Sequence, residues 1–355
     1  MVTDMSNSRN FELNCPLPIS EYDRVLLAHG GGGTLSRKLI QEMFFSQFGN
    51  DFLLTEHDSA MLPAGKGRVA FSTDSYVVQP IFFPGGNIGD LAVNGTVNDL
   101  AMAGAIPKFL SVGFIIEEGL LMEDLWQIIL SMQQAAERAG VQIVTGDTKV
   151  VDKGKGDKIF INTSGIGWIP EDVNIAPQNC REGDVILING HIAEHGVTIM
   201  SAREGLEFET TLESDTAALN GLVAEILAVS KNVHVLRDPT RGGLASALNE
   251  IASAASLGIE IEEEAIPIAE QVKGACEILG LDPLYIANEG KLLAFVSAAD
   301  GPDVLEAMRS HPLGTNSAVI GRVIKEHPGT VIMKTSIGSG RIVDMISGEQ
   351  LPRIC

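Results

Sequence analysis

One segment, Ile88 to Ala103, constrains the fold more than any other stretch of the chain. Apart from one polar stripe, most of its surface is Leu, Val, Ala, Gly and Met, so we expect this helix to be buried. Asp90, Asn94 and Asn98 recur every four residues and therefore share one face of that helix. Buried polar groups need partners. The stripe therefore predicts either metal and phosphate ligands or a hydrogen-bonded structural network.

Further acidic residues of the first half lie in apolar or small surroundings. A predicted strand carries Asp74 in its middle, and a short strand predicted over 141–144 ends just before Asp147 and Lys149. An apolar strand seldom keeps a carboxylate that binds nothing. Together with Asp99, beside Asn98, these carboxylates are the hard oxygen ligands that Mg²⁺ prefers next to phosphate. We expect Asp74, Asp99 and Asp147 to hold the metal of a nucleoside triphosphate.

A run of glycines precedes the helix predicted from Leu35 to Phe48, and it comprises Gly30, Gly31, Gly32 and Gly33. Such a loop lets backbone amides approach an anion closely. Its spacing matches neither the P-loop nor the dinucleotide-binding fingerprint. The run therefore fits a phosphate-binding loop or a plain hinge.

The second half of the chain has a different pattern. A chain of 355 residues is too long for one ordinary core, and the polar stretch 172–182 predicts a joint between two domains. Arg241, Gly242 and Gly243 open a helix that runs to about residue 255. Their amides and guanidinium favour an anion, although Arg241 would also suit a structural role at a helix start. The remaining pattern predicts strands over 184–189, 259–263, 291–296, 318–324 and 331–334, and helices over 197–203, 216–229, 269–279 and 303–311.

The chain ends on a cysteine, Cys355, behind a Pro-Arg pair and a polar stretch. This pattern predicts a mobile tail over 346–355 with an extended reach of roughly 25 Å. Its thiol would be able to visit one site, be loaded, and deliver to another; the alternative is an ordinary frayed terminus. An N-terminal extension over 1–24 leaves domains over 25–170 and 171–345.

The net charge, the apolar runs and the cysteine spacing limit which partners and which cellular compartment we expect. A formal net charge of -21 argues against nucleic acid, because a phosphate backbone would be repelled. No apolar run is long enough to span a bilayer, and the polar first residues carry no signal core. The four cysteines are widely spaced without a CxxC pair, which is typical of free thiols in a reducing compartment. We expect a soluble cytoplasmic protein with no membrane partner.

Seven motifs together resemble one known family. They are His29–Gly33, Phe71–Val78, Val97–Ala101, Thr145–Val151, Asp238–Gly243, Asn288–Gly290 and Pro352–Cys355. They are similar to those of the HypE family of hydrogenase maturation proteins, within the PurM-like ATP-binding superfamily that also includes aminoimidazole ribonucleotide synthetase, selenophosphate synthetase and thiamine-monophosphate kinase. The terminal Pro-Arg-Ile-Cys separates the HypE family from those relatives. The resemblance covers the chain from about residue 25 to its end.

The resemblance implies a fold and an activity. The fold is an N-terminal α+β domain whose mixed sheet forms a barrel in a homodimer, followed by a C-terminal α/β sandwich, with ATP in the cleft between the domains. The activity is ATP-dependent dehydration of a carbamoyl group on Cys355, from thiocarboxamide to thiocyanate. A carbamoyltransferase, HypF, loads the cysteine, and a HypC–HypD scaffold receives the cyano group for the iron of [NiFe]-hydrogenase.

The resemblance also assigns roles to residues. ATP would be bound by the glycine loop, by Asp74, Asn98, Asp99 and Asp147 with Mg²⁺, and by Arg241, Gly242 and Gly243. Glu289 is the candidate base, and Lys149 either relays protons or only binds phosphate. Two rival readings remain: another PurM-like ligase or kinase acting on a free small molecule, and a thiol carrier without catalytic activity.

Overall fold

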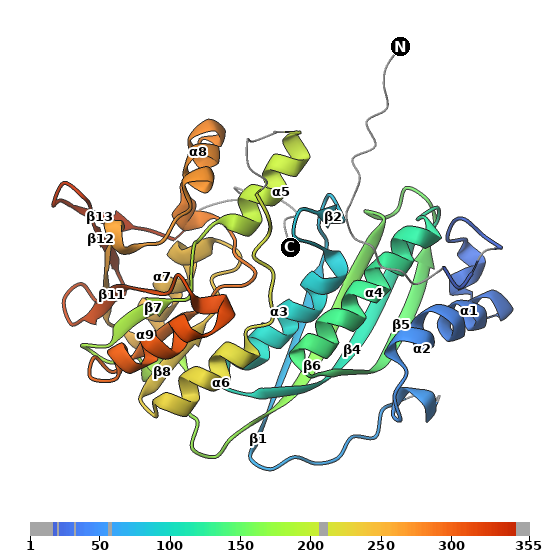
Figure 1. The fold of residues 1–355 in the computed structure, drawn as a ribbon, viewed down its shortest axis with the longest axis horizontal. Coiled ribbons are helices and arrows are strands. Elements are labelled where there is room, and N and C mark those ends of the chain that lie inside the picture. The colour runs from blue at the N-terminus through green and yellow to red at the C-terminus, as the bar shows by residue number, and fades with distance from the viewer. Residues whose placement is uncertain (1–16, 20, 32, 56–58, 206–211, 346–355) are drawn as a thin grey trace.

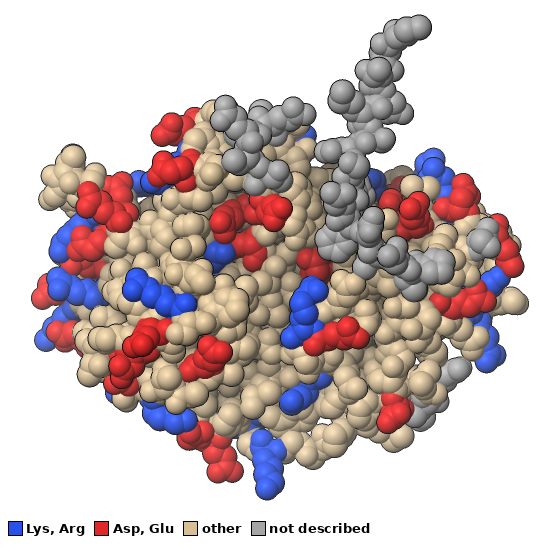
Figure 2. Space-filling view, in the orientation of Figure 1, with Lys and Arg blue, Asp and Glu red and all other residues tan. Residues whose placement is uncertain are grey.

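The computed structural model describes residues 17–19, 21–31, 33–55, 59–205 and 212–345. Two β-sheets, each covered by helices, lie side by side and form two domains (Figure 1). The predicted two-domain organisation of mixed sheets and helices is confirmed. Figure 2 shows Lys and Arg mixed with Asp and Glu over both domains, so neither carries charge of a single sign on that face.

The first domain is built on a four-stranded sheet of order β1-β6-β4-β5, in which only β4 and β5 run parallel. Helices α3 and α4 cover one face of this sheet (Figure 1). The elements are α1 (Thr34–Leu39), α2 (Phe45–Phe48), β1 (Arg68–Tyr76), β2 (Phe82–Phe83), β3 (Gly86–Asn87), α3 (Ile88–Met102), β4 (Ile106–Glu117), α4 (Met122–Ala139), β5 (Gln142–Val151) and β6 (Ile159–Ile169). A π-helical turn, Ile40–Phe44, joins α1 to α2, so the helix predicted over 35–48 is confirmed as one helical stretch.

Helix α3 is the buried helix that its composition predicts, since every residue except Asp99 is buried. Asn87 caps it: its Oδ1 accepts the Gly89 N–H at 2.7 Å, and Asp90 Oδ1 accepts the Asn87 N–H at 2.7 Å. One member of the polar stripe, Asp90, therefore serves the helix start.

Among the described residues, no α-helix packs on the other face of the sheet (Figure 1). Its exposed apolar side chains are Val69, Phe71, Ile106 and Ile115, each between 47% and 68% exposed. Four large apolar side chains on one uncovered sheet face mark an interaction surface. We call these four residues the open face.

The second domain is a seven-stranded sheet of order β13-β12-β9-β11-β7-β10-β8, antiparallel except for the β12–β9 pair. Helices α6 and α9 pack on one face, and α5, α7 and α8 on the other. The elements are β7 (Val185–Ile188), α5 (Glu194–Glu204), α6 (Asn220–Val229), β8 (Val233–Arg237), α7 (Gly243–Ala255), β9 (Gly258–Glu262), α8 (Glu270–Leu279), β10 (Leu293–Val296), α9 (Gly301–Ser310), β11 (Ala318–Ile324), β12 (Val331–Lys334) and β13 (Gly340–Val343).

Two predicted boundaries are wrong for identifiable reasons. The strand predicted over 141–144 continues as β5 to Val151, because each residue from Thr145 onward pairs with β4. Asp147 and Lys149 therefore lie within a strand, not beyond its end. The helix predicted over 216–229 begins only at Asn220, because the residues before it give their backbone groups to α3.

Four strands were not predicted at all, namely β2, β3, β8 and β13. Each is two to five residues long, too short for a clear alternating pattern. Strand β8 places the segment that follows Arg237 at the domain junction.

The end of the predicted N-terminal extension packs on the first domain. Ile19 is 1% exposed within its core, and Arg24 Nη1 donates to the Gly119 carbonyl at 2.7 Å. Gly32, residues 1–16 and the tail 346–355 with Cys355 lie outside the described residues. Within the part of the chain that the structure describes, no helix is long and apolar enough to cross a membrane.

Candidate functional site

The predicted site residues fall in two neighbourhoods. One is a pocket between β5 and the helical stretch α1–α2. The other is a group of acidic side chains where the two domains meet. Their geometry decides which predicted residues can act together.

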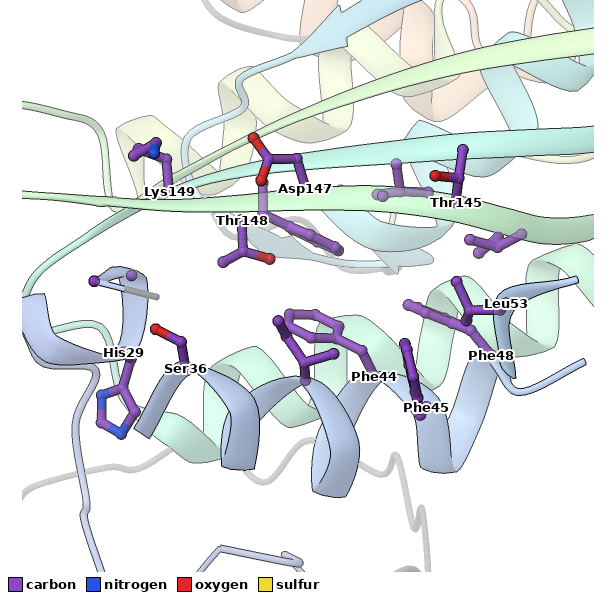
Figure 3. A pocket seen from close by; sticks show the side chains of 17 residues that line it. His29, Ser36, Phe44, Phe45, Phe48, Leu53, Thr145, Asp147, Thr148 and Lys149 are labelled. Carbon is purple, nitrogen blue, oxygen red and sulfur yellow. The ribbon is translucent and has the colours of Figure 1, made fainter. Parts of the chain in front are cut away.

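The pocket has a volume of about 430 Å³ and has two chemically different ends (Figure 3). Aromatic side chains from α2 and the turn before it, Phe44, Phe45 and Phe48, form the apolar end. Gly30, Gly31, Ser36 and the part of β5 around Thr148 line the polar end, whereas Thr145 lies at the apolar end near Phe48 (Figure 3). Such a pocket suits a ligand that joins a flat apolar base to a charged phosphate chain.

Close contact with β5 explains the glycine at position 30. A Cβ on Gly30 would lie 2.6 Å from the Val150 backbone nitrogen, closer than side chains tolerate. The loop therefore touches β5 at this point. A Cβ on Gly33 would meet nothing within 4 Å, and one on Gly31 only ordinary contacts, so packing in the described structure does not require glycine at these two positions.

Strand β5 alternates its side chains between the pocket and the open face. Thr148 points into the pocket, while Asp147 and Lys149 point to the other side of the sheet (Figure 3). The register agrees: Asp147 is level with Gly113, Asn162 and Ser75 across the sheet. Asp147 and Lys149 also line a second hollow, of about 530 Å³, on that side.

Asp74 and Asp147 do not meet within one subunit. They lie on β1 and β5, the two edges of the four-stranded sheet, three strand spacings or roughly 14 Å apart. Asp74 is level with Thr163, whose hydroxyl contacts α3, so Asp74 and Asp147 also face opposite ways. The predicted metal ligands Asp74, Asp99 and Asp147 are therefore not gathered in one chain.

Asp74 and Asp99 do approach each other at the domain junction. The Ser72 hydroxyl donates to Asp99 Oδ2 at 2.7 Å, and Arg241 Nη2 lies 3.7 Å from Asp74 Oδ1. Burial raises the pKa of Asp99, the Ser72 hydrogen bond opposes that shift, and the charge of Asp74 adds to it.

A residue that the sequence reasoning did not select joins this group. Asp238 follows β8 directly, and burial, together with the charge of Asp99, raises its pKa to about 7. The available signal was an acidic residue right after a buried strand, inside the Asp238–Gly243 motif. Among the described residues, no three His, Cys, Asp or Glu side chains are already arranged to hold a metal.

Glu289 is the most unusual carboxyl group of the junction. It is 4% exposed, and its Oε1 has no hydrogen-bond partner among the described residues. Burial, then the charges of Asp215 and Asp238, raise its pKa well above the usual range. A buried carboxyl group with an unpaired oxygen is suited to exchanging a proton with a ligand.

Asn98 belongs to the structural network that the sequence left as an alternative. Its Nδ2 donates to the carbonyls of Ala217 at 3.0 Å and Glu289 at 3.1 Å, and its Oδ1 accepts the Leu219 N–H at 2.8 Å. Asn94 likewise donates to Thr216. These bonds bind the segment before α6 and the Glu289 loop to helix α3.

The helix start at Arg241 is shaped by its glycines. Gly242 and Gly243 have φ of 76° and 61°, and a Cβ on Gly243 would lie 2.6 Å from the carbonyl oxygens of Leu284 and Ile286. The Arg241 side chain is 71% exposed and extends toward Asp74 across the junction.

Comparison with known proteins supplies the family. Models of the AIR synthase related protein match here, the N-terminal domain at residues 56–169 and the C-terminal domain at residues 181–334. Carbamoyl dehydratase HypE of Cupriavidus necator is 52% identical over 353 residues, covering 99% of this chain and 100% of that protein.

Two solved structures are similar over most of the chain. A crystal structure of hydrogenase maturation protein HypE in complex with ATP has a TM-score of 0.90 at 49% identity, covering 93% of this chain and 99% of that chain. A crystal structure of a HypE–HypF complex has a TM-score of 0.77 at 48% identity, covering 87% of this chain and 99% of that chain. The chain therefore belongs to the HypE family of AIR synthase related proteins.

Proposed function

We propose that this protein uses ATP to dehydrate a carbamoyl group on its own Cys355, converting a thiocarboxamide to a thiocyanate. The observation that carries the proposal is the Glu289 carboxyl group, which is buried near Asp74 and Asp238 and has one oxygen without a hydrogen-bond partner among the described residues. This is an acid–base group next to a potential metal–phosphate site. The relatives named carbamoyl dehydratase support the same chemistry.

ATP would occupy the pocket between β5 and α1–α2. The adenine would lie against Phe44, Phe45 and Phe48, and the phosphates would run past Gly30 and Gly31. The related HypE structure in complex with ATP supports a nucleotide site. Arg241, Gly242 and Gly243 would meet the phosphates from the second domain of another subunit, because within one subunit Arg241 lies with Asp74 at the edge of the sheet opposite β5.

We infer that Mg²⁺ would bind at the acidic junction together with the nucleotide. Burial, with the neighbouring charges of Asp99 and Asp74, raises the pKa of Asp238, and a divalent cation relieves that repulsion. We propose Asp74, Asp99 and Asp238 of one subunit as the Mg²⁺ ligands. Asp147 of a second subunit would reach the same nucleotide. Bound there, Mg²⁺ would offset negative charge on the transferred phosphoryl group.

The reaction divides into two balanced steps. The carbamoyl oxygen attacks the γ-phosphorus, the bond to ADP breaks, and one N–H proton passes to the Glu289 carboxylate. The carbon–oxygen bond then breaks, phosphate leaves with the second N–H proton, and sulfur–carbon≡nitrogen remains. Phosphorylation is needed because an amide oxygen alone is a poor leaving group. Glu289 must be ionised to accept the first proton, so its raised pKa ties the rate to pH.

We propose that the protein works as a homodimer joined through the open face. Val69, Phe71, Ile106 and Ile115 would be buried there, in a barrel made of two sheets. Lys149 lies on the same side as Asp147 and would serve the same shared nucleotide, as a phosphate ligand or a proton relay.

The partners proposed follow from the same chemistry. A carbamoyltransferase of the HypF type would load Cys355, and the HypE–HypF complex among the related structures supports this partner. An iron scaffold of the HypC–HypD type would receive the cyano group.

Mass spectrometry of the C-terminal peptide tests the proposal. We expect carbamoylation of Cys355 by the transferase, then loss of one water only when ATP is added. Cys355→Ser should abolish both mass changes. If Cys355→Ser retains full substrate-driven ATP turnover, the protein acts on a free small molecule. If Asp147→Asn still loses water from the loaded tail without hydrolysing ATP, the chain is only a carrier.

A further inference from the structure

A buried charge network lies directly behind Glu289, and the proposed chemistry makes no use of it. Lys291 Nζ lies 3.2 Å from Asp215 Oδ2 and 3.0 Å from Glu194 Oε2. The side chains of Lys291 and Asp215 are 11% and 1% exposed. Burying two charges is costly unless each is well compensated, so such a pair calls for a reason.

The network holds the backbone of Glu289. Asp215 Oδ1 accepts the Glu289 N–H at 3.1 Å, while Asn98 donates to the Glu289 carbonyl at 3.1 Å. A Cβ on Gly290 would overlap the Asp215 carbonyl oxygen, so the two backbone segments are in close contact there. Both backbone polar groups of Glu289 are therefore fixed, one by Asp215 and the other by α3.

We propose that Asp215, itself fixed by Lys291, is a positioning residue that aims the Glu289 carboxyl group at the reacting carbamoyl group. The inference rests on the proposed dehydration. It explains why a lysine and an aspartate are buried next to the acid–base group: neither touches the substrate, and each acts through Glu289. Asp215→Asn keeps an oxygen acceptor for the Glu289 N–H, whereas Lys291→Met releases the carboxylate that provides it.

Because charged groups surround Glu289, the positioning role of Asp215 can be tested through the pH dependence of the reaction. Facing it are Asp215 from the segment before α6, Asp238 after β8, Asp74 and Tyr76 from β1, and Arg241 before α7. Asp215 is the largest electrostatic contributor after burial, and Lys291 neutralises it. Loss of Lys291 should move the pKa of Glu289 up, and loss of the Asp215 charge should move it down.

The experiment compares Asp215→Asn, Lys291→Met and Lys291→Arg in the full-length protein with its tail carbamoylated by the transferase. Lys334→Met is the matched control, because Lys334 also bridges two carboxylates, Glu260 and Glu262, but on β12 and β9 away from the junction. The measurements are ATP affinity, the single-turnover rate of water loss, and the pH midpoint of that rate.

We expect Lys291→Met to slow water loss at least about 10-fold, because misplaced groups lose rate steeply, while ATP affinity stays within about twofold. The pH midpoint should rise by about one unit in Lys291→Met and fall by about one unit in Asp215→Asn. Lys291→Arg, which keeps the charge, should recover most of the rate.

Equal pH midpoints in Asp215→Asn, Lys291→Met and Lys334→Met, with equal rate losses, would overturn the inference and show a purely structural pair. Weakened ATP binding as the main effect would also overturn it. Failure of the wild-type protein to lose water would refute the proposed function instead, so the two failures are distinguishable. If Lys291→Met does not fold, Asp215→Asn and Lys291→Arg still decide the question.

Discussion

The separation of Asp74 from Asp147 leads to a quantitative prediction about mixed dimers. Oxygen ligands of one Mg²⁺ lie about 2.1 Å from the ion and so within about 4 Å of each other. In one subunit these two carboxylates lie roughly 14 Å apart along the sheet and face opposite ways. If both approach the same metal–phosphate group, they must come from different subunits.

The perturbation pairs two variants that are each nearly inactive. Asp74→Asn and Asp147→Asn should each slow dehydration at least about 100-fold, because each removes a charge that stabilises the transferring phosphoryl group. In a two-fold symmetric dimer, a heterodimer of the two variants contains one doubly damaged site and one intact site. Purified heterodimers should therefore recover about half of the wild-type rate, and an unsorted equal mixture about a quarter.

The assay uses two affinity tags, co-expression and tandem purification, followed by ATP-dependent water loss from the loaded tail. The reciprocal control pairs wild type with the double variant Asp74→Asn/Asp147→Asn. Shared sites predict no activity in that heterodimer, whereas sites within one subunit predict about half. A silent heterodimer of single variants together with a half-active control dimer would refute the reasoning.

Three further predictions follow from the geometry. Asp238→Asn should flatten the pH dependence of the free energy of unfolding, because the pKa of Asp238 is about 7 in the folded protein and 3.8 ordinarily. The folded wild type keeps this proton longer, so it should lose at most about 4 kcal/mol of stability as pH rises from about 4 to 7. Urea unfolding in EDTA measures this, and an unchanged slope in the variant would contradict the burial of Asp238. Gly243→Ala should lower the free energy of unfolding by at least about 2 kcal/mol in the same assay, because its Cβ would overlap the 284–286 backbone. The control Gly280→Ala, at a similar φ with open space around it, should lower it by about 1 kcal/mol, and equal losses would count against the close contact. Phe45→Ala should raise the KM for ATP several-fold at unchanged kcat in steady-state kinetics, and a lowered kcat at unchanged KM would place the adenine elsewhere.

Local spacing in the sequence was enough for several features of the site. The composition of α3 predicts its burial, because apolar and small residues occupy the helix surface outside one narrow polar stripe, and the structure buries every residue but Asp99. The same spacing predicts that Asp90, Asn94 and Asn98 find polar partners, and each does. The helix predicted to open at Arg241–Gly243 and to run to about residue 255 is also confirmed as α7.

Other features needed the tertiary structure. Nothing local shows that Asp238 joins Asp74 and Asp99, because that proximity depends on β8, whose five residues carry little pattern. The prediction placed Asp147 with Asp74, and sheet order and register instead put them at opposite edges. Successive residues of a strand face opposite sides of the sheet, so the facing of Asp147 depends on its position within β5. The strand predicted over 141–144 ended before Asp147, and the prediction therefore could not assign its side.

By itself the sequence determined the chemistry available to this protein: a buried polar helix, a glycine loop, a glutamate before a glycine, and a cysteine at the chain's end. The tertiary structure alone decided how those groups combine. Only there is Glu289 buried, with Asp215 and Lys291 behind it and with one oxygen left without a partner among the described residues. The physical reason is that residue types follow from local constraints, whereas the proton affinity of a carboxyl group follows from burial and from charges brought in by distant segments.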